Sequence, residues 1–503
     1  MKMTVSQIAD AARATILAAP CSAEELVKGL TWDSRTVTPG CLYVAFVGER
    51  VDGHDFVASA IADGARAALV TRDPGEAAVR AANDAGAAVL LVDDCEEALA
   101  RLAAAWRYMQ KGTVIGLTGS SGKTSSKNLV RDVLAARMSV VATQANQNNE
   151  IGVPNTLLAA DDAQAVVVEM GMRGLGQIAK LCKVAHPDWG LVTNVGESHI
   201  ELLGSRENIA RAKAELFANL PDDGVAFVNA ADERVEDLIR FGRLRERGVR
   251  TVFFDGYVNE RPALLDDPAT ADTPFVWASD ITLNEQGQPS FTLNASNVPC
   301  VGAGTDADAK RASAVTGQVP CKLELRGLHN VSNACSAAAV GLVAGMELQE
   351  CADALAGAQP EAGRQQILHA ANGALIVDDS YNANPDSMRV SLATFAAMEV
   401  EGRRIAVLGD MLELGDFSRE CHERVGTYAA QAGLDLLICV GELSTALASS
   451  AVRCGMDPAA VICHADAAGA LAELRGLVGP DDAVLVKASH SIGLQAVAEG
   501  LVA

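Results

Sequence analysis

Short apolar runs alternate along this chain with longer segments in which apolar residues recur every three or four positions. Such runs occupy residues 114–117, 165–168, 189–192 and 405–408, and each is followed by glycine or polar residues. A short bounded run is typical of a buried strand, whereas the longer spacing is typical of an amphipathic helix. This alternation predicts an α/β protein whose parallel sheets bind ligands at the C-terminal ends of their strands.

The alternation falls into three units. The first ends near residue 106, the second begins with a strand-like segment at residues 112–118, and the third begins near residue 360. A length of 503 residues agrees with this division, because a domain averages about 150 residues. We therefore predict an N-terminal domain at residues 1–106, a central domain at 107–359 and a Rossmann-like C-terminal domain at 360–503.

The pattern changes between residues 261 and 320, where short segments are interrupted by Gly, Pro and Asn. Two alternating runs flank the sequence NEQGQ at residues 284–288, and this arrangement is typical of a β-hairpin. We expect an antiparallel insertion attached to the parallel sheet of the central domain.

Composition excludes several classes of protein. The net charge of −23 argues against a broad nucleic-acid surface. No apolar run approaches the ~18 residues of a membrane span, and Asp10 and Arg13 interrupt the region where a secretory signal needs apolar residues. The twelve cysteines, from Cys21 to Cys463, include no C-x-x-C pair and are interpreted as reduced core residues. We expect a cytoplasmic protein without a nucleic-acid or membrane partner.

The segment GLTGSSGKT, at residues 116–124, follows a strand-like run and precedes a helical pattern. Gly119 and Gly122 permit a tight turn, Lys123 can reach terminal phosphates, and the Thr124 hydroxyl can bind Mg²⁺. Leu117 stands where the common phosphate-loop pattern has its first glycine. A glycine-rich turn with a solvated lysine is the alternative, but strand, loop and helix together favour a nucleotide site.

Three further residues are candidates for a magnesium site. Glu169 ends the second strand of the central unit, and His199 follows the third, so both belong at the sheet edge that holds the loop. Lys213 lies on the apolar face of a helical segment with Ile209 and Leu216. It is either a lysine whose stem packs on the core or a functional group near the metal.

These motifs resemble the Mur ligases, the ATP-dependent amide-bond ligases of peptidoglycan precursor synthesis, over nearly the whole chain. The TGSSGKT form of the loop is typical of that family and accounts for Leu117. Other segments resemble the branch that joins D-alanyl-D-alanine to UDP-N-acetylmuramoyl-tripeptide, and they lie at residues 146–158, 169–178, 327–334, 378–388 and 407–415. The sister branch that adds a diamino acid typically carries an Asp-Asn-Pro motif, which this sequence lacks.

The resemblance implies specific roles. Lys123, His199 and Lys213 would be catalytic, and Thr124, Glu169, His199 and Lys213 would hold Mg²⁺, the lysine as a CO₂-derived carbamate. The ATP-binding residues would be Gly119, Ser120, Ser121, Gly122, Lys123, Thr124, His329, Asn330, Asn333, Arg364, Asp379, Tyr381 and Asn382. Ser34 and Arg35 would recognise the uridine nucleotide, and Asn148 and Asn149 the muramoyl part of the substrate. The family is mostly monomeric, so a monomer is expected.

Two alternatives remain open at this point. The chain could be a ligase that adds a diamino acid or, like folylpolyglutamate synthase, glutamate. It could instead be a phosphate-loop switch, although the Asn-Lys-x-Asp motif of guanine switches is absent from the sequence. One departure from the family lies near the C-terminus, where KASHSIG places His490 at a position that is often arginine.

Overall fold

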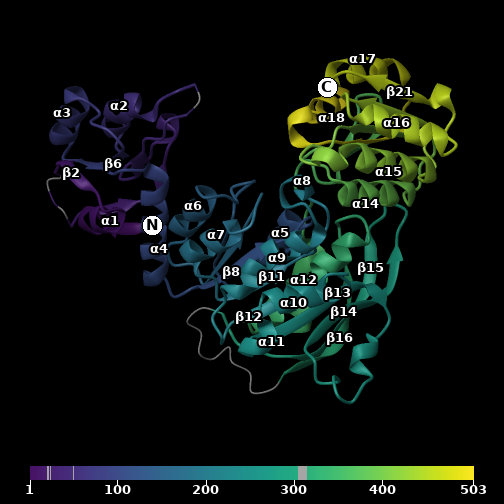
Figure 1. Cartoon of the computed structure of the whole chain (residues 1–503), viewed down its shortest axis with the longest axis horizontal. Coiled ribbons are helices and arrows are strands. Elements are labelled where there is room, and N and C mark those ends of the chain that lie inside the picture. Colours follow the sequence, from purple (N-terminus) through teal and green to yellow (C-terminus); the bar gives the residue numbers. More distant parts are fainter. Residues whose placement is uncertain (20–21, 23, 49, 304–313, 503) are drawn as a thin grey trace.

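The computed structural model describes residues 1–19, 22, 24–48, 50–303 and 314–502. Figure 1 shows three lobes that follow one another along the sequence, from purple through teal to yellow. Each lobe contains a sheet with parallel strands, which confirms the predicted α/β class. Cys21 and residues 304–313 of the predicted insertion lie outside the described residues.

The N-terminal lobe holds a five-stranded sheet in the order β2-β7-β6-β5-β4 and a small antiparallel pair, β1 and β3. All neighbours in the larger sheet are parallel except β2 with β7. Its strands are β1 (Lys2–Thr4), β2 (Thr15–Ala18), β3 (Leu26–Lys28), β4 (Leu30–Thr31), β5 (Leu42–Val44), β6 (Ala67–Val70) and β7 (Ala88–Leu91). Its helices are α1 (Val5–Ala12), α2 (Val57–Ala62), α3 (Glu76–Ala85) and α4 (Cys95–Met109).

The central lobe is built on a nine-stranded sheet in the order β16-β15-β14-β13-β12-β11-β8-β10-β9. Its strands are β8 (Thr113–Thr118), β9 (Val140–Ala142), β10 (Ala165–Glu169), β11 (Trp189–Val192), β12 (Val225–Asn229), β13 (Arg250–Asn259), β14 (Phe275–Leu283), β15 (Pro289–Val298) and β16 (Val315–Lys322). Its helices are α5 (Lys123–Ala135), α6 (Gly152–Ala159), α7 (Gln177–Ala185), α8 (Ile200–Leu203), α9 (Arg206–Ala218), α10 (Val235–Phe241), α11 (Leu244–Arg247), α12 (His329–Val343) and α13 (Leu348–Gly357).

The predicted hairpin is present and extends this sheet. β14 and β15 pair antiparallel across the turn at residues 284–288, and β15 pairs antiparallel with β16. β14 also pairs in parallel with β13, so the antiparallel strands continue the parallel sheet at one edge. The loops at the carboxyl ends of β8, β10 and β11 therefore remain free to form a site.

The C-terminal lobe contains a six-stranded sheet in the order β17-β18-β22-β19-β20-β21, in which only β17 is antiparallel. Its strands are β17 (Gln366–His369), β18 (Leu375–Asp378), β19 (Arg404–Gly409), β20 (Leu436–Val440), β21 (Val461–His464) and β22 (Ala483–Lys487). Its helices are α14 (Pro385–Ala396), α15 (Ser418–Gln431), α16 (Ser444–Arg453), α17 (Ala467–Leu477) and α18 (Gln495–Val502).

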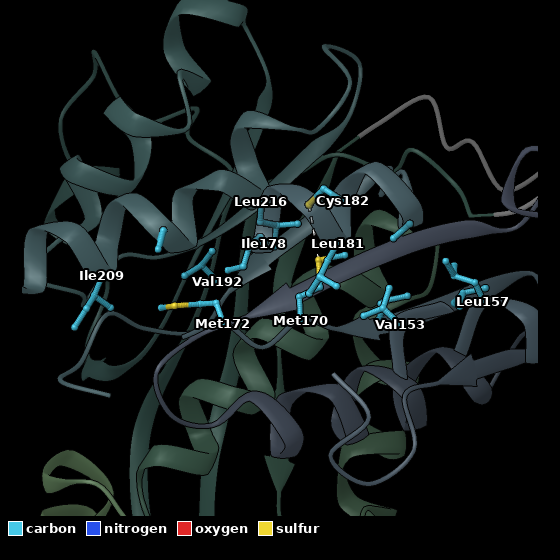
Figure 2. Close-up of a cluster of buried hydrophobic side chains, with 14 of the residues drawn as sticks. Val153, Leu157, Met170, Met172, Ile178, Leu181, Cys182, Val192, Ile209 and Leu216 are labelled. Atoms are coloured by element: carbon cyan, nitrogen blue, oxygen red, sulfur yellow. Dashed lines mark hydrogen bonds between the residues drawn. The ribbon is translucent and has the colours of Figure 1, made fainter. Parts of the chain in front are cut away.

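A buried cluster fixes α6, α7 and α9 against the central sheet (Figure 2). Val153 of α6, Ile178 of α7 and Leu216 of α9 meet there with residues from the strand ends, such as Met170. The Cys182 thiol lies 3.8 Å from the Met170 sulfur. Because α9 is anchored along its apolar face, the inward position of Lys213 on that helix is fixed by packing.

The predicted domain boundaries stay predictions, and α4 continues from Cys95 to Met109 across the first of them. None of the helices described is both long and apolar enough to cross a membrane.

Candidate active site

The predicted phosphate loop joins the end of β8 to the start of α5. Gly122 has φ 74°, a left-handed conformation that favours glycine. A Cβ on Gly119 would lie 1.8 Å from Thr193 Oγ1, so only glycine permits this approach to the loop after β11. Lys123 Nζ donates to Gly119 O at 2.7 Å, and burial lowers the pKa of its amine. The Lys123 side chain is therefore held over the phosphate loop.

Two serines tie the loop to the segment after β11. The Ser120 N–H donates to Asn194 O at 3.1 Å, and Ser120 Oγ accepts from Gly196 N–H at 2.9 Å. The Ser121 N–H donates to Asn194 Oδ1 at 3.0 Å. These bonds hold the loop in one conformation next to the segment that carries His199.

Glu169 ends β10 as predicted and is buried. Its Oε1 accepts a hydrogen bond from Asn148 Nδ2 at 2.9 Å, while Oε2 has no partner among the described residues. An unpaired buried carboxylate oxygen is costly, so a ligand is expected at that atom. Asn149 instead accepts from the Gly152 N–H at 2.9 Å, where it supports the turn into α6.

His199 directly precedes α8 and has φ 63°, which is uncommon for a residue with a side chain. Its Nδ1 lies 2.7 Å from Glu413 Oε2, a residue of the C-terminal lobe. Burial, and next the positive charge of Lys123, lower the pKa of His199 to about 4. The imidazole is therefore neutral at neutral pH, which is the form that can bind a metal.

Lys213 is 1% exposed, and its side chain forms no hydrogen bond or ion pair with another described residue. Burial, and next the charge of Lys123, lower the pKa of its amine well below the usual value, while Asp232 acts in the opposite direction. A solvated snorkelling lysine would extend its amine into bulk water. The Lys213 side chain is buried instead.

One large cavity of about 1250 Å³ brings these residues together with residues of the C-terminal lobe. The predicted residues that line it are Gly119, Ser120, Ser121, Gly122, Lys123, Thr124, Asn148, Asn149, Glu169, His199, Lys213, His329, Asn330, Asn333, Arg364, Asp379, Tyr381 and Asn382. The described residues contain no group of three His, Cys, Asp or Glu side chains arranged to hold a metal.

The C-terminal lobe reaches the phosphate loop directly. Arg364 Nη2 donates to Thr124 Oγ1 at 2.8 Å, and its guanidinium carbon lies 4.0 Å above the Tyr381 ring. Asp379 forms a 2.8 Å ion pair with Lys487, whose Nζ also donates to Asn382 O at 3.0 Å. Both lobes therefore contribute charged groups to one side of the cavity.

The HNVSN segment forms the start of α12. Asn330 Oδ1 accepts from Asn333 Nδ2 at 3.0 Å, and Asn333 Oδ1 accepts from Ser126 Oγ of α5 at 3.0 Å. Burial lowers the pKa of His329 to about 4, and its Nδ1 has no partner among the described residues. A neutral imidazole with a free polar atom thus faces the cavity beside the phosphate loop.

Sequence reasoning missed a second set of contacts between the lobes, around residues 195–199. Arg424 of α15 pairs with the carboxylate of Glu197 through both Nη atoms. Asp386 Oδ2 accepts from the Glu197 N–H at 3.1 Å, and Asn384 Nδ2 donates to Ser198 Oγ at 2.7 Å. No short-range pattern marks Glu197 or Asp386 as a contact residue, because their partners are distant in the sequence.

The two candidate substrate-binding residues of the N-terminal lobe lie outside the cavity. Ser34 and Arg35 belong to a short 3₁₀ helix, Ser34–Thr36, and neither lines the cavity. The Arg35 guanidinium pairs with Asp33 at 2.6 Å and is largely exposed. Their suggested contact with a uridine nucleotide stays a prediction.

A phosphate loop that faces a Rossmann-like lobe across a shared cavity is typical of a nucleotide-dependent enzyme. Family models match three stretches of this chain: the Mur ligase family catalytic domain at residues 26–107, the Mur ligase middle domain at 117–341, and the Mur ligase glutamate ligase domain at 363–490. The chain belongs to the Mur ligase family.

Named relatives agree over the full length. A UDP-N-acetylmuramoyl-tripeptide–D-alanyl-D-alanine ligase of Mycobacterium leprae is 37% identical over 96% of this chain and 94% of its own. A crystal structure of MurF from Acinetobacter baumannii superposes with a TM-score of 0.81 at 28% identity, covering 100% of this chain and 99% of that one. MurF of Thermotoga maritima in complex with ADP superposes with a TM-score of 0.72 at 26% identity, covering 94% of this chain and 97% of that one.

Proposed function

We propose that this chain is the ATP-dependent ligase that joins D-alanyl-D-alanine to UDP-N-acetylmuramoyl-tripeptide and releases ADP and phosphate. The observation that carries the proposal is the shared cavity, in which the Lys123 loop faces Arg364 from the C-terminal lobe. The relatives that match nearly the whole chain bear the name of this activity. A ligase that adds a diamino acid or glutamate is not favoured.

The reaction begins when the terminal carboxylate of the tripeptide attacks the γ-phosphate of ATP. Lys123 and the loop amides bind the terminal phosphates, and Arg364 supplies a second cation from the C-terminal lobe. These charges are worth most where negative charge develops on the transferring group. The amine of D-alanyl-D-alanine then attacks the acyl phosphate, and phosphate leaves as the amide forms.

The residues present suit Mg²⁺. Thr124 supplies a hydroxyl oxygen and Glu169 supplies the unpaired Oε2, which are ligands of the kind that Mg²⁺ prefers, and His199 would add a neutral imidazole nitrogen. Bound Mg²⁺ would neutralise charge on the phosphates. In the structure, Thr124 Oγ1 accepts from Arg364, whose positive charge would lie beside the metal, so movement of this arginine away from the hydroxyl would favour binding of Mg²⁺.

Lys213 completes the proposed site as a carbamate. Its buried amine has no partner, and burial disfavours the ammonium form, so the neutral amine that reacts with CO₂ is available. A carbamate replaces a positive charge near the metal with oxygen atoms of the kind that Mg²⁺ prefers. The position also matches the lysine that is carbamylated in the family.

The remaining proposed roles belong to other residues that line the cavity. His329, Asn330 and Asn333 would contact the adenine side of ATP, and Asp379, Tyr381 and Asn382 would approach the nucleotide from the C-terminal lobe. Asn148 and Asn149 would meet the muramoyl part of the substrate. The proposed enzyme acts as a monomer in the cytoplasm.

A phosphate-release assay tests the proposal. Purified protein with ATP, UDP-N-acetylmuramoyl-tripeptide and D-alanyl-D-alanine should release phosphate, and omission of either acceptor should abolish turnover. Replacing the dipeptide by a diamino acid or by glutamate tests the two ligase alternatives. Equal phosphate release without any second substrate would instead identify a nucleotide switch and overturn the proposal.

A further inference from the structure

Two cysteines of the C-terminal lobe face each other on neighbouring strands, away from the active site. Cys439 of β20 pairs in register with Cys463 of β21, and the two strands are parallel. Neighbouring strands lie ~4.8 Å apart, and a disulfide needs Cα atoms about 4.4–6.8 Å apart. The backbone therefore already has the spacing of a cross-strand disulfide.

Both side chains point to the same face of the sheet. Leu437 and Val461, two residues earlier on each strand, pack in the cluster that also contains Cys439. Ile438 and Ile462 pack on the opposite face. Because side chains alternate along a strand, the thiols of Cys439 and Cys463 share the face covered by α15 and α16.

The two thiols differ in access to solvent. Cys439 is fully buried on an inner strand, whereas Cys463 is exposed on the edge strand. Reagents from solution therefore reach Cys463 first, and Cys439 lies behind it as the second thiol. Neither residue lines the active-site cavity.

The environment also activates the outer thiol. Interaction with the neighbouring Cys439 thiol lowers the pKa of Cys463 to about 6, whereas the same interaction, followed by burial, raises the pKa of Cys439. Burial raises the pKa of the core thiols Cys95 and Cys321 to about 12. Only the thiolate is nucleophilic, so Cys463 is the reactive member of the pair.

We propose that Cys439 and Cys463 form an oxidation site at which a hydroperoxide converts the two thiols into a reversible cross-strand disulfide. The site requires a small oxidant and is independent of the ligase reaction.

The reaction balances in two steps. The Cys463 thiolate attacks one oxygen of hydrogen peroxide, the O–O bond breaks, and a sulfenic acid forms as the leaving hydroxide takes up a proton to become water. Cys439 then loses its proton, its thiolate attacks the sulfenic sulfur, and the displaced hydroxide takes up that proton and leaves as a second water while the S–S bond forms. Two thiols are oxidised by two electrons, and one peroxide is reduced to two waters.

Peptide mapping of the full-length protein after treatment with one equivalent of hydrogen peroxide tests the site. The expected product is a disulfide that joins the Cys439 and Cys463 peptides and that disappears with dithiothreitol. In Cys439→Ser, a sulfenic acid should accumulate at Cys463 and be trapped by dimedone. In Cys463→Ser, the Cys439 peptide should remain reduced.

Cys454 provides a matched control, because it is also exposed and belongs to the same lobe. At pH 6 Cys463 should react with iodoacetamide about tenfold faster than an ordinary exposed thiol, after allowance for the weaker nucleophilicity of a low-pKa thiolate. Its rate should rise with pH through about 6 and then level off. Peroxide products without a Cys439–Cys463 disulfide, or equal alkylation of Cys454 and Cys463 at pH 6, would overturn the proposal.

Discussion

Arg424 of α15 and Glu197, two residues before His199, form a bidentate ion pair between the C-terminal and central lobes. Asp386 and Asn384 of the C-terminal lobe hold the same segment by its backbone and by Ser198. His199 itself lies 2.7 Å from Glu413. Within the central lobe, Ser120 also holds this segment, through Gly196 and Ser198. Contacts from both lobes therefore position the segment that carries a proposed metal ligand.

Arg424→Ala should lower kcat by about tenfold or more, because His199 loses the anchor of its segment, and a coupled contact is worth about 0.5–3 kcal/mol. The melting temperature should change little, since both side chains are partly exposed and such pairs contribute little stability. The reversed pair Glu197→Arg with Arg424→Glu should recover part of kcat. A parent-like kcat in Arg424→Ala would contradict the positioning role.

Lys123→Ala should reduce ligation by about 10²-fold or more while the fold is retained, because the phosphates lose a preorganised cation. Phosphate release and circular dichroism measure the two quantities. Lys111→Ala, at an exposed position outside the cavity, is the matched control and should match the parent. Near-normal turnover in Lys123→Ala is the outcome that would remove Lys123 from the phosphate site.

The sequence predicted the parts of the site that are formed by residues close together in the chain. The strand, loop and helix around Gly119 and Lys123 are consecutive in the sequence, and Glu169 is the last residue of a strand. Short-range patterns are therefore enough to predict these residues as part of the site. The Arg364–Thr124 hydrogen bond joins residues 240 positions apart, and no local signal encodes it. Family resemblance placed Arg364 near the nucleotide, but not on the hydroxyl of Thr124.

The edge strands of the C-terminal sheet were also difficult to predict from the sequence. β17 and β21 are short, half-buried strands at the edges of their sheet, and their sequences lack the continuous apolar runs of β19 and β22. The Glu197–Arg424 pair was missed for a related reason. Each residue looks like a solvated charge until the other lobe supplies its partner.

The C-terminal lobe should move when substrates bind. The Arg364 guanidinium next to Thr124 Oγ1 would repel a metal ion bound there, so we expect it to leave the hydroxyl and turn to the phosphates. Small-angle scattering should detect a change on addition of a non-hydrolysable ATP analogue with Mg²⁺ and tripeptide substrate. Arg364→Ala should weaken this response and lower kcat. Identical profiles with and without ligands would count against movement of the lobe.

Leu216→Ala should destabilise the protein by about 2–5 kcal/mol, because it opens a cavity in the cluster that anchors α9 (Figure 2). Unfolding in urea measures the loss. Leu175→Ala is the matched control, since Leu175 is 51% exposed and its removal leaves no cavity. Equal free energies of unfolding for the two variants would show that this cluster does not hold α9.

Lys213 should act as a carbamate and not as an ammonium. Lys213→Ala should lose most activity and recover part of it with added formate or acetate, because a short carboxylate can occupy the position of the missing ligand. Lys213→Arg keeps a positive charge and cannot form the same carbamate, so it should stay inactive. The parent protein in ¹³C-bicarbonate should show a carbamate carbon resonance that is absent from Lys213→Ala, a readout that does not depend on turnover. An Arg variant as active as the parent, or no such resonance, would leave Lys213 as a packing residue, and the metal site would then need another ligand.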